Sequence, residues 1–344
     1  VWFEAVIGYL SAPIEWSQVT GQAEAWREWW TNPEAKQFHF IGKDNIFFHT
    51  SLWPAELMGV GSAFMEIFAG EEIPLILPYD VPANQFMNLE GRKISGSRNW
   101  AVWGRDVLTR FDPDAVRYYL TVNMPENKDS DWDWSEFVAR NNNELVATWG
   151  NLANRVLAFC YKHWEGHVPD VDPATLREAD LTLLTAIENG FNTVGAELEA
   201  VRLRSALAET MKLATAVNQY LDVQAPWSAV KTDRDAAAKT VYTALKAIDS
   251  LKVLFAPFLP FTCERLHEFF GYETPLFGEQ YTETVTDSLG EHKVLRYRNV
   301  GRDNIPSYWK PSDLKPGQQL NQPGPLFKKL EPSVAEEERA RLGK

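Results

Sequence analysis

The first ninety residues alternate short apolar runs with amphipathic stretches. Strand-like runs lie at residues 1–10, 38–50 and 74–81, and helical patterns lie at residues 17–30 and 51–65. Alternation of strands with helices is typical of a parallel sheet whose faces are covered by helices. We therefore expect this part of the chain to belong to a doubly wound α/β domain.

A shorter segment with the pattern of a connecting module follows. Residues 85–89 and 92–95 flank Glu90 and Gly91, which predicts a hairpin. Residues 105–122 show two helical patterns, and Pro113 separates them because proline interrupts a helix.

From Asp133 onward the pattern is helical. Asp133 and Glu136 have the spacing of a capping box, with Asp in the place of Ser or Thr. Apolar residues then recur at steps of three and four, which predicts helices that each bury one face and together form a bundle. These stripes comprise Leu145, Trp149, Leu152, Val156 and Phe159, then Leu184, Ile187, Phe191, Val194 and Leu198, then Leu203, Leu207, Met211, Ala214, Val217 and Leu221, then Val241, Leu245, Ile248 and Phe255.

Composition indicates a globular protein from a reducing compartment. The chain has 344 residues, of which 45% are hydrophobic, and this is enough to bury real cores. Cys160 and Cys263 lie far apart without a CxxC pair, which argues against a disulfide framework or a zinc knuckle. No apolar run reaches the roughly 18 to 20 residues of a membrane span, so we expect a cytoplasmic protein. Because the chain opens at Val1 inside an apolar segment, we also expect that an upstream part is missing.

Charge is distributed unevenly along the chain. The net charge of −13 argues against nonspecific nucleic-acid binding, because Lys and Arg normally supply that affinity. Between Arg92 and Arg117, however, six cationic residues face only three Asp. An acidic protein can still present a local basic strip to phosphate.

Two histidines have the spacing of a possible metal site. His163 and His167 lie four residues apart, as ligands on one helix face would. Gly166 between them favours a solvated helix end instead, and we expect no metal site in this chain.

The segment Lys93 to Ser97, followed by Arg98, has the composition of a phosphate-binding loop. Glycine frees backbone N–H groups to form an anion-binding turn, and cations stabilise charge on a phosphoryl group. On composition alone, an ordinary surface turn is the more frequent explanation.

Several sequence motifs precede and follow this loop in a fixed order. They are WFEAVIGY at Trp2–Tyr9, FIGKDNIFFHTSLWP at Phe40–Pro54, KISGS at Lys93–Ser97, NNNELVATWGNLANRV at Asn141–Val156 and QAPW at Gln224–Trp227. LEGRK precedes KISGS, and RNWAVW and DPDAVRYYL follow it. With these motifs the chain resembles the C-terminal two-thirds of a class I methionyl-tRNA synthetase, and KISGS resembles the KMSKS signature loop of that family.

The resemblance implies a fold class of α/β followed by all-α. Residues 1–87 would form the C-terminal part of a Rossmann-type catalytic domain, and residues 88–132 a connecting module that carries the signature loop. Residues 133–274 would form an α-helical anticodon-binding bundle. Residues 275–344 would form an extension that packs back on the other parts.

The resemblance also implies a role for individual residues near the catalytic centre. The positions of the methionine pocket are matched by Trp2, Ala5, Tyr9, His49 and Trp53. An aromatic cage suits an uncharged thioether, because sulfur makes favourable contacts with rings. The ATP-binding positions are matched by Gly42, Asp44, Lys93 and Ile94, with Asp44 on the ribose. The catalytic positions of the loop are matched by Lys93, Ser95, Gly96, Ser97 and Arg98.

Three residues of the helical part match the positions that recognise the anticodon. Asn151 and Arg155 share a helix face and offer hydrogen-bonding edges to splayed bases, while Trp227 offers a stacking platform. The implied partners are L-methionine, ATP with Mg²⁺, and tRNA(Met) with a CAU anticodon. Zinc is expected only in the upstream part, and a monomer is favoured.

The sequence departs from the family pattern at three places. No HxGH motif occurs in the chain, Gly96 stands where the family has a lysine, and Glu4 and Val6 replace Asp and Pro. A tRNA-binding module without synthetase activity therefore stays open as an alternative. A related ligase for leucine, isoleucine or valine is disfavoured by the FIGKD, FHT and QAPW segments.

Overall fold

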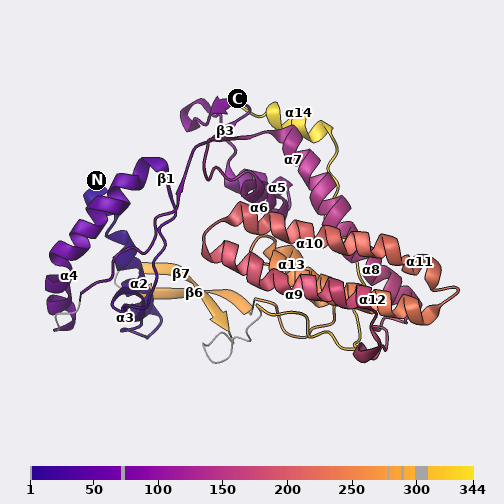
Figure 1. Ribbon diagram of the computed structural model, residues 1–344. Helices are drawn as coiled ribbons and strands as arrows, with labels where there is room; N and C mark the ends of the chain where they lie inside the picture. The colour runs from indigo at the N-terminus through magenta and orange to yellow at the C-terminus, as the bar shows by residue number, and fades with distance from the viewer. Residues whose placement is uncertain (1, 71–73, 278, 288–289, 299–308) are drawn as a thin grey trace. The chain divides into compact units, whose positions relative to one another are not determined.

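In the computed structural model, an α/β segment is followed by a long helical part (Figure 1). The structure describes residues 2–70, 74–277, 279–287, 290–298 and 309–344. The chain divides into two units. Unit 1 consists of Val1–Met87, Pro125–Ser130 and Thr284–Lys293, and unit 2 consists of Asn88–Met124, Asp131–Glu283 and Val294–Lys344. The four-part division drawn from the sequence stays a prediction.

Unit 1 begins with helices, so the strand predicted at residues 1–10 is wrong. Helix α1 spans Trp2–Ala5, and α2 spans Gly8–Val19. Val6 and Leu10 are both buried in one apolar cluster, as expected for residues four apart along helical backbone. A short apolar run fits a buried strand or a buried helix equally well, and periodicity alone does not separate them.

The core of unit 1 is built largely from tryptophan. Helix α3 spans Arg27–Trp30, and α4 spans Trp53–Ala69, which confirms the helix predicted at residues 51–65. The helix predicted at residues 17–30 is interrupted after Val19. There the Ser17 hydroxyl accepts a hydrogen bond of 2.8 Å from the backbone N–H of Trp26. The buried cluster contains Val6, Leu10, Trp26, Trp30, Trp53, Leu57, Met65 and Leu75.

The sheet of unit 1 is shorter than the sequence pattern predicts. Strand β1, Ile41–Gly42, pairs in parallel with β2, Ala83–Asn84. Beyond β1 the predicted strand at residues 38–50 turns helical, with η1 at Lys43–Asn45 and the π-helical turn η2 at Phe48–Leu52. The run at residues 74–81 forms only an isolated bridge, between Phe38 and Asp80. The parallel pairing, with α4 between the two strands in sequence, agrees with the α/β expectation.

The predicted hairpin is confirmed in structure. Strands β3, Met87–Leu89, and β4, Arg92–Lys93, are antiparallel, with Leu89 opposite Arg92. Glu90 and Gly91 both have positive φ, of 50° and 72°, as a tight hairpin turn requires. Strand β5, Ser130–Trp132, joins the other edge of β3.

The two helices predicted after the hairpin are also confirmed. Helix α5 spans Gly104–Arg110, and α6 spans Pro113–Val122. Asp112 caps α6 by accepting a hydrogen bond from the N–H of Asp114, so the proline lies at the first helical position, where its missing donor costs nothing.

The helical part of unit 2 follows the predicted stripes. Helices α9, α10 and α12 pack against one another (Figure 1). Asp133 caps α7 through the N–H of Glu136, but the Glu136 side chain bonds Arg140, so only half of the capping box forms. The helices are α7 Trp134–Arg140, η4 Asn141–Gly150, α8 Asn151–His163, η5 Pro173–Thr175, α9 Glu178–Glu199, α10 Leu203–Gln224, α11 Pro226–Ala229, α12 Arg234–Phe255 and α13 Pro260–Phe269.

The last seventy residues contain more regular structure than predicted. Strands β6, Glu279–Asp287, and β7, Gly290–Arg298, form a hairpin that the sequence analysis missed. Helix α14 spans Ser333–Arg339. Among the described residues, none of the helices has the length and apolar character needed to cross a membrane.

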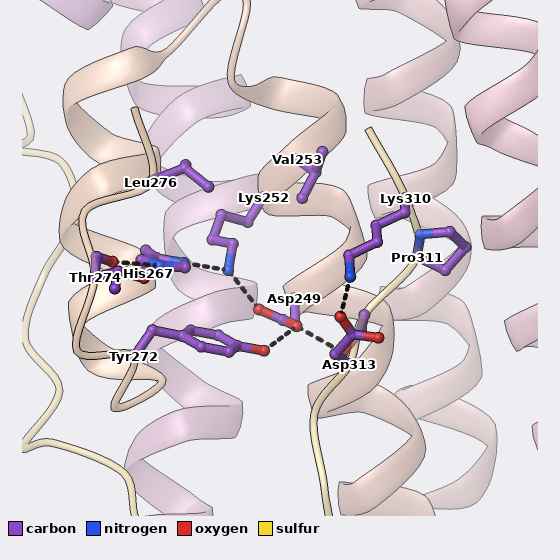
Figure 2. Close-up of a pocket in the computed structure, with 11 residues that line it drawn as sticks. Asp249, Lys252, Val253, His267, Tyr272, Thr274, Leu276, Lys310, Pro311 and Asp313 are labelled. Carbon is purple, nitrogen blue, oxygen red and sulfur yellow. Dashed lines mark hydrogen bonds and ion pairs between the residues drawn. The ribbon is translucent and has the colours of Figure 1, made fainter. Parts of the chain in front are cut away.

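A buried polar network on α12 and α13 holds the segment after residue 309 against the bundle. Lys252 Nζ donates to Asp249 Oδ1 at 2.6 Å and to His267 Nδ1 at 2.8 Å (Figure 2). Tyr272 and Ser312 donate their hydroxyls to the other oxygen of Asp249. These side chains line a cavity of about 220 Å³.

His267 is held neutral by this network. Because an ammonium can only donate, Nδ1 of His267 accepts, and the ring proton lies on Nε2, which donates to the Thr274 carbonyl at 2.9 Å. Burial, and then the charge of Lys252, lowers the pKa of His267 to about 4.

Stability should therefore fall as the pH drops below the ordinary histidine range. The unfolded chain takes up a proton near pH 6.5 while folded His267 does not, so the contribution is complete above pH 6.5 and is lost toward pH 4. The loss amounts to about 3 kcal/mol of unfolding free energy. Urea unfolding at several pH values should show a shallower pH dependence for His267→Gln than for the unaltered chain. His167→Gln, an exposed control, should keep the original dependence. Identical curves for all three proteins would refute this assignment.

Candidate functional site

Three residues predicted for the methionine pocket lie together in unit 1. The Tyr9 hydroxyl lies 2.8 Å from His49 Nε2, and the Tyr9 and Trp53 ring centroids are 6.3 Å apart. His49 and Trp53 are buried, while Tyr9 is 42% exposed. The π-helical turn η2 joins directly to α4 and places His49 and Trp53 four residues apart. The cluster therefore has a buried floor and one accessible aromatic edge.

Hydrogen bonds orient the imidazole of His49. Nδ1 lies 2.9 Å from the Asn45 carbonyl oxygen, which can only accept, so Nδ1 donates this hydrogen bond. Nε2 is then left to accept from the Tyr9 hydroxyl. The Tyr9 hydroxyl is thereby held in one orientation.

One further ring of this cluster, His39, was not predicted from the sequence. Its centroid lies 4.8 Å from that of Tyr9 and 5.8 Å from that of His49. Burial, and then the proximity of His49, lowers the pKa of His39. Its position two residues before β1, in an alternating segment, was the available signal. Trp53 Nε1 and His39 Nε2 are buried and have no hydrogen-bond partner among the described residues.

The other two predicted pocket residues belong to α1. Ala5 ends α1 and is exposed. Trp2 begins α1, but its side chain lies outside the described part of the structure.

The predicted ATP-binding residues Gly42 and Asp44 lie where β1 ends. Gly42 closes the strand, and Asp44 lies in the 3₁₀ turn that follows it. The Asp44 carboxylate is exposed and has no hydrogen-bond partner among the described residues. Its neighbour Lys43 is occupied, since Nζ lies 3.0 Å from Gln85 Oε1 and 2.9 Å from Asp129 Oδ1. Asp44 is thus the acidic group at the carboxyl end of this parallel strand that is available to a ligand.

The signature loop belongs to unit 2 and is closed at its base. Ser95 and Trp100 exchange two backbone hydrogen bonds, of 2.8 and 2.9 Å. Between them lies a 3₁₀ turn, Gly96–Arg98, whose first N–H groups have no partner within the turn. The Ser95 and Ser97 hydroxyls lie 3.3 Å apart. The exposed residues of this loop are Lys93, Ile94, Gly96, Ser97 and Arg98.

Two residues after the loop fix its shape, and the sequence analysis did not select them. Asn99 ends the 3₁₀ turn with a left-handed backbone, φ 47°, and accepts a hydrogen bond from Trp103 Nε1 at 2.9 Å. The Trp103 ring covers Gly96, where an added Cβ would lie 3.5 Å from the ring edge. The RNWAVW segment that contains both residues was the available signal.

The predicted anticodon residues lie on α8 and α11. The Arg155 guanidinium lies 4.8 Å from the centroid of the Trp227 ring, within cation–π range. Phe159, one turn beyond Arg155, packs edge-on against Trp227 at 4.8 Å. Asn151 is the first residue of α8 and is exposed beside this pair. Phe159, which the stripe pattern assigned to the core, is therefore also a support for Trp227.

His163 and His167 do not share a helix face. Helix α8 ends at His163, and Gly166 has a φ of 75°. The His163 ring packs against Phe159 at 4.4 Å, while His167 Nδ1 bonds the Glu165 carbonyl.

Two family models match the chain in succession. Residues 1–157 match the model described as tRNA synthetases class I (M), and residues 168–297 match the anticodon binding domain of methionyl tRNA ligase.

Curated relatives match almost the whole chain. A methionine–tRNA ligase of Thermomicrobium roseum is 52% identical over 345 residues, which covers 99% of this chain and 56% of that protein. One from Chloroflexus aggregans is 50% identical over 350 residues, with coverages of 99% and 57%. The chain thus spans a little over half the length of these relatives.

Solved structures show the same fold. The apo form of Mycobacterium tuberculosis methionyl-tRNA synthetase has a TM-score of 0.70 at 23% identity, and the match covers 96% of this chain and 56% of that one. Since both family models match in order and the relatives align over 99% of this chain, the chain belongs to the class I methionyl-tRNA synthetase family.

Proposed function

We propose that this chain supplies the methionine pocket, the signature loop and the anticodon-binding helices of a methionine–tRNA ligase. The observation that carries the proposal is the cluster of Tyr9, His49 and Trp53. Its members come from three elements and meet around one hydrogen bond of 2.8 Å. The names of the curated relatives support the same function.

The cluster suits methionine because it offers aromatic rings to the thioether. A thioether has no strong donor or acceptor, so recognition depends on shape and on sulfur–aromatic contacts of about 0.3–1.5 kcal/mol each. The hydrogen bond to His49 satisfies the Tyr9 hydroxyl, so this polar group does not need a water molecule inside the site. A rigid cage separates side chains of similar size by roughly 1–3 kcal/mol.

The first step would join methionine to AMP. A carboxylate oxygen of methionine attacks the α-phosphorus of ATP, and pyrophosphate leaves. Asp44 would accept the ribose hydroxyls, while Lys93, Arg98 and the turn at Gly96 would face the phosphates. Mg²⁺ would share the charge of the phosphates. Positioning and electrostatics suffice for this step, without a protein nucleophile.

The second step would transfer the methionyl group to tRNA. The terminal ribose hydroxyl attacks the acyl carbon of the adenylate, and AMP leaves. Selection of the tRNA would occur on α8 and α11, where Asn151 and Arg155 offer hydrogen bonds to the CAU anticodon and Trp227 offers one stacked face. We further propose that the protein acts in the cytoplasm as a monomer.

A second candidate function is a tRNA-binding module without ligase activity. The observation that favours it is Gly96, which stands in the signature loop where the family has a lysine. Pyrophosphate exchange separates the two functions.

The full-length protein that contains this chain should catalyse methionine-dependent exchange of pyrophosphate into ATP. Leucine, isoleucine and valine should support less than a tenth of that rate. Their side chains fit the cage less well, and the resulting loss of binding free energy is roughly 1–3 kcal/mol. Exchange is measured with labelled pyrophosphate at matched amino-acid concentrations. Exchange with one of the branched amino acids instead would exclude the methionine assignment, and no exchange at all would favour the binding module.

Replacing Trp227 by Ala should weaken aminoacylation of tRNA with a CAU anticodon. Loss of one stacked base, worth about 1–3 kcal/mol, should raise the KM for tRNA roughly 10- to 100-fold. Pyrophosphate exchange should stay unchanged, because Trp227 lies on α11 and not in the pocket. Val223→Ala, which alters an apolar side chain that is 78% exposed, is the control. Equal losses in exchange and aminoacylation would count against the anticodon role.

Restoring the signature lysine should accelerate adenylate formation. Gly96 has no left-handed φ, and an added Cβ meets only ordinary contact with Trp103, so Gly96→Lys fits the loop. An added ammonium near the phosphates should raise the kcat of exchange roughly tenfold. Gly96→Ala controls for the backbone. A lysine variant no faster than the alanine variant would show that Lys93 and Arg98 already supply the required charge.

A further inference from the structure

Helix α14 and the residues after it contact the signature-loop module at three places. All of these contacts lie within unit 2, and they join segments more than 200 residues apart in sequence. One contact precedes the loop, one lies at its end and one follows it.

The first contact is made with the hairpin turn that carries the loop. Arg339 Nε donates to Glu90 Oε2 at 2.8 Å, and Nη2 donates to the Ser135 hydroxyl at 2.8 Å. The other oxygen of Glu90 accepts from the N–H of Trp134 at 2.8 Å. Glu90 thus ties α14 and the start of α7 to the turn three residues before Lys93.

The second contact is made with the helix that follows the loop. Glu338 accepts two hydrogen bonds of 2.8 Å from Arg110, the last residue of α5. The Glu338 carboxylate is buried, with only 4% of the residue exposed. A bidentate pair in such surroundings is strong and directional. Arg110 also pairs with Asp106 at 2.7 Å, and Glu338 also pairs with Arg341 at 3.3 Å.

The third contact is made with the loop itself. The N–H of Gly343 donates to the Asn99 carbonyl at 3.0 Å, and Asn99 Nδ2 donates to the Lys344 carbonyl at 2.6 Å. Asn99 ends the 3₁₀ turn with a left-handed backbone conformation and accepts a hydrogen bond from Trp103. The segment after α14 therefore bonds the residue that shapes the loop.

The segment that leads into α14 is itself fixed to the bundle. Asn142 exchanges two hydrogen bonds with the backbone of Leu330, of 2.8 and 2.9 Å. Phe327 packs so closely on Gly150 that an added Cβ would lie 2.9 Å from its ring. Helix α14 consequently starts from a rigid support, and its pairs can resist movement of the hairpin.

We propose that α14 is a brace that positions the signature loop, with Arg339 and Glu338 as the positioning residues. The brace holds the turn before the loop and the helix after it, so that only residues 94–98 are left to move when phosphates bind. The inference rests on the proposed function for its link to ATP, but the positioning itself is a property of this chain.

Trypsin provides a direct test on the 344-residue chain, because Arg92, Lys93 and Arg98 are cleavage sites at the loop. Arg339→Gln should increase the initial cleavage rate at Lys93 and Arg98 roughly tenfold, since cleavage follows the population of the opened segment. Cleavage at Arg204, on α10 far along the chain, should change less than twofold. Glu337→Gln, an exposed α14 control with no partner among the described residues, should match the unaltered chain.

Two further variants separate positioning from general destabilisation. Arg339→Lys keeps one charge toward Glu90 and should restore slow cleavage in large part. Glu338→Gln, which keeps the shape but removes the charge, should open the loop as Arg339→Gln does. Equal acceleration of cleavage at Arg204 and at the loop would overturn the brace. Unchanged cleavage at the loop in both Arg339→Gln and Glu338→Gln would also overturn it.

Kinetics of the full-length protein test the link to ATP. In pyrophosphate exchange, Arg339→Gln should raise the KM for ATP or lower kcat at least fivefold, the range of an ordinary coupling between sites, and leave the KM for methionine unchanged. Equal loss of both affinities would overturn the link. If the unaltered protein shows no exchange, the proposed function fails, while the proteolysis result still decides the positioning role.

Discussion

An aromatic cluster at the junction between the signature-loop module and the bundle is the interaction on which unit 2 depends. Its members are Phe111, Tyr119, Trp132, Trp134 and Phe137. Trp132 lies on β5, which pairs with β3 of the loop hairpin. Phe137 lies on α7, the first helix of the bundle. Their centroids lie 5.5 Å apart, and each such pair contributes about 0.5–1.5 kcal/mol beyond burial. This junction joins the loop module to the first helix of the bundle within one compact unit.

Polar groups add direction to that apolar junction. The Tyr119 hydroxyl accepts from the N–H of Asp133 and therefore sets where α7 begins. The Glu90 carboxylate accepts hydrogen bonds from the N–H of Trp134 and from Arg339 Nε. One carboxylate therefore joins the hairpin, the bundle and α14. Burial of apolar rings does not distinguish one orientation from another, whereas hydrogen bonds between fixed groups do. The hydrogen bonds of Glu90 therefore fix the orientation of the hairpin turn that precedes the loop.

The helical bundle could be predicted from the sequence because its signal is local. Stripes such as Leu145, Trp149 and Leu152 repeat with the helical period, and all three are fully buried. The same reasoning failed at residues 1–10, where a short run has too few positions to reveal its period, and at the β6–β7 hairpin, whose strands are polar. Motif resemblance selected Tyr9, His49 and Trp53, which the structure brings together, but it did not select His39, which carried no motif signal of its own.

By itself, the sequence determined the family, the helical periods and the hairpin turn. Each of these depends on spacing within a few residues, which the chain order states directly. Only the tertiary structure decided that Phe159 supports Trp227, that Asn99 and Trp103 shape the loop, and that Arg339 reaches Glu90 across 249 positions. Such contacts depend on how distant elements pack, because a side chain interacts with what folding brings within a few ångströms rather than with its neighbours in sequence.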